Sequence, residues 1–257
     1  MMVAAVICVR GRDNRSYGLI HAKFISFFFL SIFSPAQVGF TPGGNSIIVT
    51  IKAQDGIFPP ATGTGSINEY IVTKTGAVDA DSLVQTFVAD GTVPFSFAFD
   101  NKGNVILAEA FGDQAPLTPE AGALSLYGNS KNSASTFLDR ENTGGTATCW
   151  VRYVEKTGCT FTTNNGGSIS SLKVAKGEIK LLNSAAATLD SPLDFDLSPD
   201  DKYLYALSAG EFLDDEQPRI HAYKVDKKCV ITEVQVISDG LPDIPTSVNG
   251  VVGLATY

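Results

Sequence analysis

Three features of the sequence predict an all-β fold. Val, Ile, Phe and Thr are frequent among the 257 residues, whereas there are only two Met and one Trp. β-branched and aromatic side chains fit pleated strands well. The 24 glycines suit a chain with many tight turns. The third feature is a repeat of short strands that starts at Pro35.

The repeat consists of four segments that align without a gap. Each one has a short alternating strand, a turn and a second β-rich strand. The segments are PAQVGFTPGGNSIIVT from Pro35, PFSFAFDNKGNVILAE from Pro94, TCWVRYVEKTGCTFTT from Thr148 and PLDFDLSPDDKYLYAL from Pro192. Equivalent positions carry Val38, Phe97, Val151 and Phe195 in the first strand, and Ile48, Leu107, Phe161 and Tyr205 after the turn. A third strand follows with Ile67, Leu124, Ile169 and Ile220 in corresponding places, and then a fourth strand.

Four antiparallel strands repeated every 44–59 residues are typical of the blades of a β-propeller. A single blade cannot bury both of its faces, so neighbouring blades stack around an axis. The predicted fold is therefore an all-β propeller with about four four-stranded blades. A β-sandwich is the alternative, but four matches at the same offsets argue against accidental similarity. The expected blades are residues 35–93, 94–147, 148–191 and 192–240, with a closing strand at 241–257.

Residues 1–34 lie outside this repeat. Their apolar run Phe24–Phe33 is shorter than the roughly 20 residues that a membrane span needs, so we expect no stable span. The run resembles a signal peptide, with Ser34 and Ala36 as small residues at a cleavage site. Cleavage there would remove the start of the first repeat, which favours a misjoined or truncated N-terminal segment.

Charge and cysteine spacing limit the function classes. The net charge of −8 argues against a nucleic-acid partner, which needs clustered Lys and Arg. Cys149, Cys159 and Cys229 have no metal-like spacing, and we expect plain buried cysteines with at least one free thiol. With only His21 and His221 in the chain, no histidine-rich metal site is expected, and we predict neither metal nor cofactor. His221 lies on a third strand, far from a propeller axis, and we interpret it as structural or on the surface.

Several segments resemble one protein family. They are PAQVGFTPGGNSIIVT, PFSFAFDNKGNVILAEA, TCWVRYVEKTGCTFTTNNGGSISSLKV, DFDLSPDDKYLYALSAG and DGLPDIPTSVNGVVGLATY. Together they are similar to the lactonase-type seven-bladed propellers, which include 6-phosphogluconolactonases and carboxymuconate cyclases. The resemblance implies seven blades, whereas four are visible, so the chain resembles an N-terminally truncated member. An open arc of blades would expose apolar faces, which predicts self-association. The resemblance implies a secreted protein, while the ambiguous signal leaves a cytoplasmic location open.

Polar residues on inner strands and blade-joining loops are the candidate site, because these line a propeller's channel. Lactone hydrolysis or muconate cyclisation requires a base and a cation for the anionic substrate. Glu109 and Arg152 are the predicted catalytic pair, and Asn164, Asp194 and Asp196 the predicted substrate-binding residues. The alternative for each is a structural role, in which Arg152 pairs with Asp194 or Asp196 of the next blade.

Two functions follow from this reading. The first is a lactonase or cyclase that acts on a small anionic sugar lactone or muconate. The second is a non-catalytic propeller, either a binding scaffold or an incomplete, inactive relative of the enzymes. The scarcity of histidine and the missing blades favour the second, whereas the resemblance favours the first.

Overall fold

The computed structural model describes residues 35–52, 65–89, 92–110, 122–129, 134–208 and 217–241. This part of the chain forms four antiparallel sheets of four strands each, as the sequence predicts. The predicted leader and most of the predicted closing strand lie outside the described residues. Blade 1 contains β1 (Pro35–Phe40), β2 (Ser46–Ile51), β3 (Ser66–Ile71) and β4 (Val84–Phe87); blade 2 contains β5 (Pro94–Phe99), β6 (Val105–Glu109), β7 (Ala123–Asn129) and β8 (Ala134–Asn142); blade 3 contains β9 (Thr148–Val154), β10 (Cys159–Asn164), β11 (Ser168–Ala175) and β12 (Glu178–Thr188); blade 4 contains β13 (Pro192–Leu197), β14 (Tyr203–Ser208), β15 (Arg219–Val225) and β16 (Ile231–Ile237). One short 3₁₀ turn, η1 (Ala80–Ser82), precedes β4.

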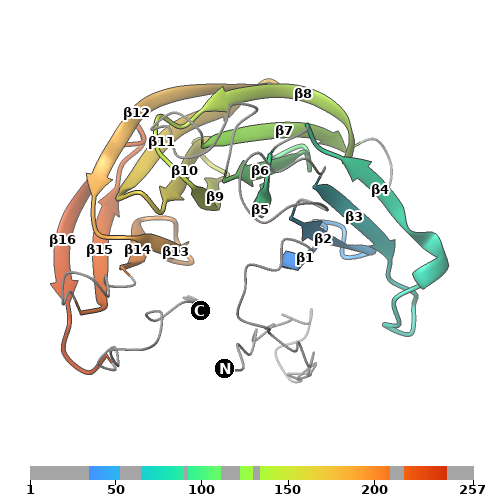
Figure 1. Cartoon of the computed structure of the whole chain (residues 1–257), viewed down its shortest axis with the longest axis horizontal. Helices are drawn as coiled ribbons and strands as arrows, with labels where there is room; N and C mark the ends of the chain where they lie inside the picture. Colours follow the sequence, from blue (N-terminus) through green and yellow to red (C-terminus); the bar gives the residue numbers. More distant parts are fainter. Residues whose placement is uncertain are drawn as a thin grey trace.

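The blades follow one another around an arc. The first strand of each blade lies on the inside of the arc and the fourth on the outside (Figure 1). Contacts between β1 and β5, β5 and β9, and β9 and β13 join successive inner strands. Blades 1 and 4 lie at opposite ends of the arc (Figure 1). We call the edge where the inner strands begin and the second strands end the entry rim.

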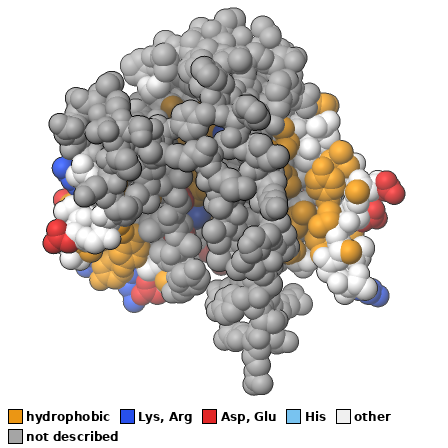
Figure 2. Space-filling view, turned by 60° about the horizontal axis from the view of Figure 1, so that its bottom comes forward, with side chains coloured by type: hydrophobic (Ala, Val, Ile, Leu, Met, Phe, Trp, Pro, Cys, Tyr) orange, Lys and Arg blue, Asp and Glu red, His pale blue; other side chains and the backbone are white. Residues whose placement is uncertain are grey.

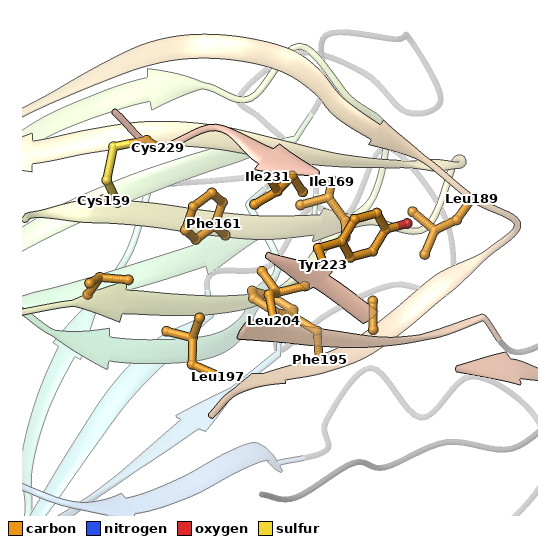
Figure 3. Packing of buried hydrophobic residues seen from close by; sticks show 12 residues of the cluster. Cys159, Phe161, Ile169, Leu189, Phe195, Leu197, Leu204, Tyr223, Cys229 and Ile231 are labelled. Carbon is orange, nitrogen blue, oxygen red and sulfur yellow. A yellow bond between two sulfur atoms is a disulfide. The ribbon is translucent and has the colours of Figure 1, made fainter. Parts of the chain in front are cut away.

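Alternation of apolar side chains gives each blade two buried faces, because successive residues of a strand point to opposite sides. Three apolar clusters result, one between each pair of successive blades. The cluster between blades 3 and 4 contains the fully buried Phe161 and Phe195 (Figure 3). Inter-blade packing of this kind is what a repeat protein needs, since no single sheet encloses its own core.

The sequence of the hairpins between first and second strands explains their turn conformation. In blade 2 the Asp100 carboxylate accepts hydrogen bonds from the backbone N–H groups of Lys102 and Asn104 at 2.8 and 2.9 Å. Gly103 adopts a φ of 80°, which residues with a side chain rarely do. The motif DNKGN is therefore a turn, as its alignment with the other segments predicts.

Strand pairing corrects the alignment after that turn. Val151 pairs with Thr162 in blade 3, but the equivalent Phe97 of blade 2 pairs with Leu107. The blade 2 hairpin is one residue shorter, and a shift of one residue moves a side chain to the other face. The residue of blade 2 that corresponds to Phe161 is therefore Ile106, and the sequence-based assignment of Leu107 is wrong. The third-strand assignments are confirmed, because Ile67, Leu124, Ile169 and Ile220 pair with equivalent residues of the second strands.

Two of the cysteines are not the plain buried thiols that we expected. Cys159 and Cys229, which are 70 residues apart, form a disulfide bond between blades 3 and 4 (Figure 3). Their separation in sequence is not a recognisable spacing, and only the stacking of the blades brings them together. Cys149 is free and buried, in agreement with the expectation.

The outer strands are linked between blades and also carry apolar side chains. Carboxylates of Asp139 and Glu141 on β8 accept hydrogen bonds from the backbone N–H groups of Ile179 and Leu181 on β12. Hydrophobic side chains are visible on both flanks of the molecule (Figure 2). Phe87 on β4, the outer strand of blade 1, is 56% exposed. Self-association through such faces stays a prediction.

Candidate functional site

Glu109 lies at the end of β6, at the entry rim, and is fully buried. It shares a face with Leu107, which packs toward blade 1. Its Oε2 atom accepts a hydrogen bond from Ser125 at 2.8 Å and lies 3.1 Å from Nη2 of Arg140. The buried carboxylate is thus balanced by a cation of the same blade. Burial and the charge of Glu109 raise the pKa of the neighbouring Tyr127.

Arg152 and Asp196 form an ion pair that joins the inner strands β9 and β13. The distance from Arg152 Nε to Asp196 Oδ1 is 2.8 Å. The two side chains are 25% and 20% exposed, so both are mostly buried. This pair is one of the two structural alternatives that the sequence allows. Asp194 is buried, and its Oδ1 atom accepts a hydrogen bond from the Phe195 N–H at 2.7 Å.

Asn164 is the centre of a buried polar network at the end of β10. Its Oδ1 atom accepts hydrogen bonds from the hydroxyls of Thr143 and Thr148, at 3.0 and 2.6 Å. Its Nδ2 atom donates to Ser168 and Ser170, at 3.0 and 2.7 Å. Both donor and acceptor capacities of the amide are engaged within the chain. The amide therefore holds the connection between blades 2 and 3 in place.

The structure does not bring the predicted catalytic pair together. Glu109 lies on the side of blade 2 that packs toward blade 1, whereas Arg152 reaches blade 4. Each charge already has a partner of opposite sign. Their catalytic role stays a prediction, and so does the substrate-binding role of Asn164, Asp194 and Asp196.

Lys52 is a candidate that the sequence analysis missed. It follows the last residue of β2 at the entry rim, and its Nζ atom lies 4.3 Å from the ring centroid of Phe95 on β5. Burial lowers the pKa of Lys52, and the nearby Cys149 partly opposes this shift. Burial also raises the pKa of the Cys149 thiol to about 12. A lysine directly after a second strand was the available signal, because that position borders the axis of a propeller.

Lys52 has no ion-pair partner among the described residues, whereas Arg140 and Arg152 each have a carboxylate. A cation held partly out of water without a counter-charge is unfavourable. Its attraction to the Phe95 ring compensates for only part of this cost. Within the described ranges, Lys52 is thus a cation of the entry rim that lacks an ion-pair partner.

The described ranges lack both a metal-ligand cluster and a membrane-spanning helix. These residues contain no group of three or more His, Cys, Asp or Glu side chains placed to hold a metal ion. They also contain no helix that is long and apolar enough to cross a membrane.

The four stacked blades, with their first strands on the inside of the arc, define the chain as part of a β-propeller. No protein-family profile matches it, and neither does any curated protein. Solved structures do match, among them a β-propeller domain and a candidate 6-phosphogluconolactonase, and they show a likeness of fold.

Three of these structures show the likeness. A candidate 6-phosphogluconolactonase from Bacteroides fragilis is 17% identical, with a TM-score of 0.53 over 78% of this chain and 56% of its own. A protein of unknown function from Desulfotomaculum acetoxidans is 14% identical, with a TM-score of 0.58 over 90% and 62%. The β-propeller domain of Cps50 (Swd1) from Myceliophteria thermophila is 7% identical, with a TM-score of 0.51 over 79% and 59%. The chain thus spans 56–62% of the length of these structures, and the likeness concerns the fold.

Proposed function

We propose that this chain binds a small organic anion, such as a sugar acid, at the entry rim where Lys52 lies. The observation that carries the proposal is the partly buried ammonium group of Lys52, which has no carboxylate partner in the described part of the chain. A carboxylate or phosphate ligand would supply the missing counter-charge. Charge-assisted hydrogen bonds to such a ligand are among the stronger polar interactions.

Anion binding at Lys52 has better support than catalysis by the predicted pair, Glu109 and Arg152. Lactone hydrolysis and cyclisation need a base that is able to take a proton. Glu109 is held by Arg140, and Arg152 is held by Asp196. Hydrolysis of a sugar lactone is the second candidate function, supported by the likeness to a candidate 6-phosphogluconolactonase. That support is an analogy of fold, not of site.

Calorimetric titration with 6-phosphogluconate tests the binding proposal. Lys52→Met removes the charge with little change in side-chain volume, and we expect at least a tenfold weaker affinity, since a charge-assisted hydrogen bond contributes about 1.5–3 kcal/mol. Lys52→Arg should retain most of the affinity. Lys180→Met, at an exposed position on β12, is the matched control. Equal affinity of the wild type and Lys52→Met, or no binding by the wild type, would refute the proposal.

Assays of 6-phosphogluconolactone and carboxymuconolactone test the second candidate. If the predicted pair is catalytic, the wild type should convert one of these lactones faster than buffer alone. Glu109→Ala and Arg152→Ala should then each lower the rate to that of buffer alone. Thermal melting of both variants separates lost chemistry from lost folding. Binding without any turnover of either lactone would leave the non-catalytic scaffold as the function.

We further propose that the protein matures in an oxidising compartment, as a secreted protein would. The Cys159–Cys229 disulfide supports this, because such bonds persist mainly outside the reducing cytosol. Thiol alkylation of protein taken directly from its native source tests it. Modification of both cysteines without prior reduction would contradict the proposal.

A further inference from the structure

The two faces of each blade differ, and the difference repeats along the chain. One face packs toward the next blade and the other toward the preceding blade, and we call them the leading face and the trailing face. Ile48, Ile106 and Phe161 occupy the same ladder position on β2, β6 and β10. They are at most 1% exposed, and each lies in the apolar cluster shared with the next blade. These residues mark the leading face, and the blade 4 residue at this position is Tyr205.

The leading face of blade 4 lies at one end of the arc (Figure 1). Tyr205 is partly exposed there, in contrast to its three buried equivalents. Ile220 on β15 is also partly exposed, although the corresponding third-strand residues of the other blades are buried, namely Ile67, Leu124 and Ile169. No blade of the described part of the chain covers this apolar face.

Blade 1 has a trailing face of the same kind at the other end of the arc. In blade 4, Phe195 pairs with Ala206 on the trailing face, in the core against blade 3. In blade 1, Val38 pairs with Val49 at the same positions. Phe195 and Ala206 are fully buried, whereas both valines are partly exposed and Phe40 on the same strand is 41% exposed. Blade 1 thus has an apolar trailing face that no preceding blade of the described residues covers.

Polar side chains on the trailing face of blade 1 bond to one another. Ser66 and Asn68 lie opposite β2 residues of this face, and Gln85 lies opposite Asn68. The Ser66 hydroxyl donates to Asn68 Oδ1 at 2.9 Å. Nε2 of Gln85 donates to both residues, at 3.2 and 3.1 Å. These groups therefore keep hydrogen bonds within the blade when another sheet packs on it.

The two ends of the arc carry the two halves of one interface. Leading and trailing faces pack together three times inside the chain, between successive blades. A second copy of the chain offers a complement to both uncovered faces at once. An interface between unlike surfaces closes into a ring when the rotation between copies allows it. Propellers typically have about 4–8 blades, so two copies with four blades each form a ring within this range, whereas three copies exceed it.

We propose that two copies of this chain associate into one closed ring of eight blades, with blade 4 of each copy packed on blade 1 of the other. The association removes both apolar ends of each arc from water, which is favourable. The two contacts are identical by symmetry, and each repeats the packing of leading face on trailing face. The ring does not depend on anion binding at Lys52, so either proposal can fail while the other holds.

The disulfide between blades 3 and 4 provides a geometric reference for this contact. Cys159 is the first residue of β10 and Tyr203 the first residue of β14, and each pairs with a lysine of the third strand. The turns around Cys229 and Gly76 also match. In both, the backbone N–H donates to the carbonyl three residues earlier, at 3.2 and 2.9 Å, and φ is positive, at 65° and 84°. Tyr203 and Gly76 are therefore equivalent to the two disulfide-bonded cysteines, on the uncovered faces of blades 4 and 1.

Engineered crosslinking tests the proposal. A Cβ atom at Gly76 meets no atom within 4 Å, and Tyr203 is 38% exposed, so both positions accept a cysteine. When Gly76→Cys and Tyr203→Cys chains are co-expressed and oxidised, we expect a covalent dimer on a non-reducing gel. Each variant alone should give single chains. No crosslink in the mixture, or a bond within one chain of the double variant, would overturn the proposal.

Analytical ultracentrifugation gives a second readout, in which the wild type should sediment with twice the mass of one chain. Val49→Glu and Tyr205→Glu each place a charge in the apolar contact, so each should raise the dimer dissociation constant by about 100-fold or more. Leu182→Glu, at a 45% exposed position on the outer strand of blade 3, is the matched control and should stay dimeric. Circular dichroism confirms that each variant is folded. A monomeric wild type, in which other segments of the chain cover both faces, or polymers without a fixed size would overturn the proposal.

Discussion

Replacing Asn164 by Ala distinguishes a structural amide from a substrate-binding one. The wild-type side chain accepts hydrogen bonds from Thr143 and Thr148 and donates to Ser168 and Ser170. All five residues except Ser168 are fully buried. The variant would remove the common partner of these hydroxyls, and water has little access to replace it.

The hydrogen bonds set the expected magnitude. Each contributes about 1 kcal/mol, which gives an upper value of about 4 kcal/mol. Thr143 Oγ1 keeps the Gly122 carbonyl at 3.2 Å, and Ser170 Oγ keeps the Ser184 carbonyl at 2.8 Å. The free energy of unfolding should therefore fall by about 2–3 kcal/mol. For a chain of this size, Tm then falls by roughly 4–12 °C.

Urea and thermal unfolding, followed by circular dichroism, measure this loss. Asn183→Ala is the control, because Asn183 is exposed on β12 and its Oδ1 atom accepts a hydrogen bond from the N–H of Ala185. Its unfolding should change by less than about 1 kcal/mol. An Asn164→Ala protein with wild-type Tm but weakened binding of 6-phosphogluconate would refute the structural reading and restore the substrate-binding one.

Three further perturbations follow from the same contacts. Arg140→Met leaves the Glu109 carboxylate buried without its cation, so the free energy of unfolding, measured with urea, should fall by about 2–3 kcal/mol. The double variant Arg140→Met, Glu109→Gln should regain most of this loss. Equal losses in the single and double variants would argue against coupling of the two residues. Reduction of the Cys159–Cys229 bond opens a 70-residue loop and should lower stability by about 4 kcal/mol, whereas a variant with Ser in place of either cysteine should no longer respond to reductant. Burial lowers the pKa of Lys52, so the unfolded chain binds more protons between that lowered value and 10.5; wild-type stability relative to Lys52→Met should rise with pH across this window and be level below it. A difference that stays constant up to pH 10.5 would contradict the assignment.

The blades were predictable because their signal is local. Alternating apolar residues and turn motifs recur at each repeat, and the third-strand residues Ile67, Leu124, Ile169 and Ile220 align as predicted. The error at Leu107 arose because a gapless alignment cannot register a turn that is one residue shorter. A strand has a period of two, so this single residue reversed the face to which the side chain was assigned.

The candidate site was less predictable because it depends on contacts between blades. The sequence allowed Arg152 to pair with Asp194 or Asp196, and only the stacking of β9 against β13 selects Asp196. The partner of Glu109, Arg140, lies two strands away on the outer edge, at no recognisable spacing. The corrected register also makes Glu109, Asn164 and Ser208 equivalent positions, which the uncorrected alignment concealed.

The inter-blade disulfide has a mechanical consequence. If the chain is pulled from its two ends, the six strands β10 to β15 lie inside the covalent loop from Cys159 to Cys229 and carry no tension once the rest has unravelled. The 70 residues of this loop would withhold roughly 240 Å of contour length, at about 3.4 Å per extended residue. Single-molecule stretching should thus record a shorter fully extended chain under oxidising conditions, and the withheld length should appear when a reductant is added.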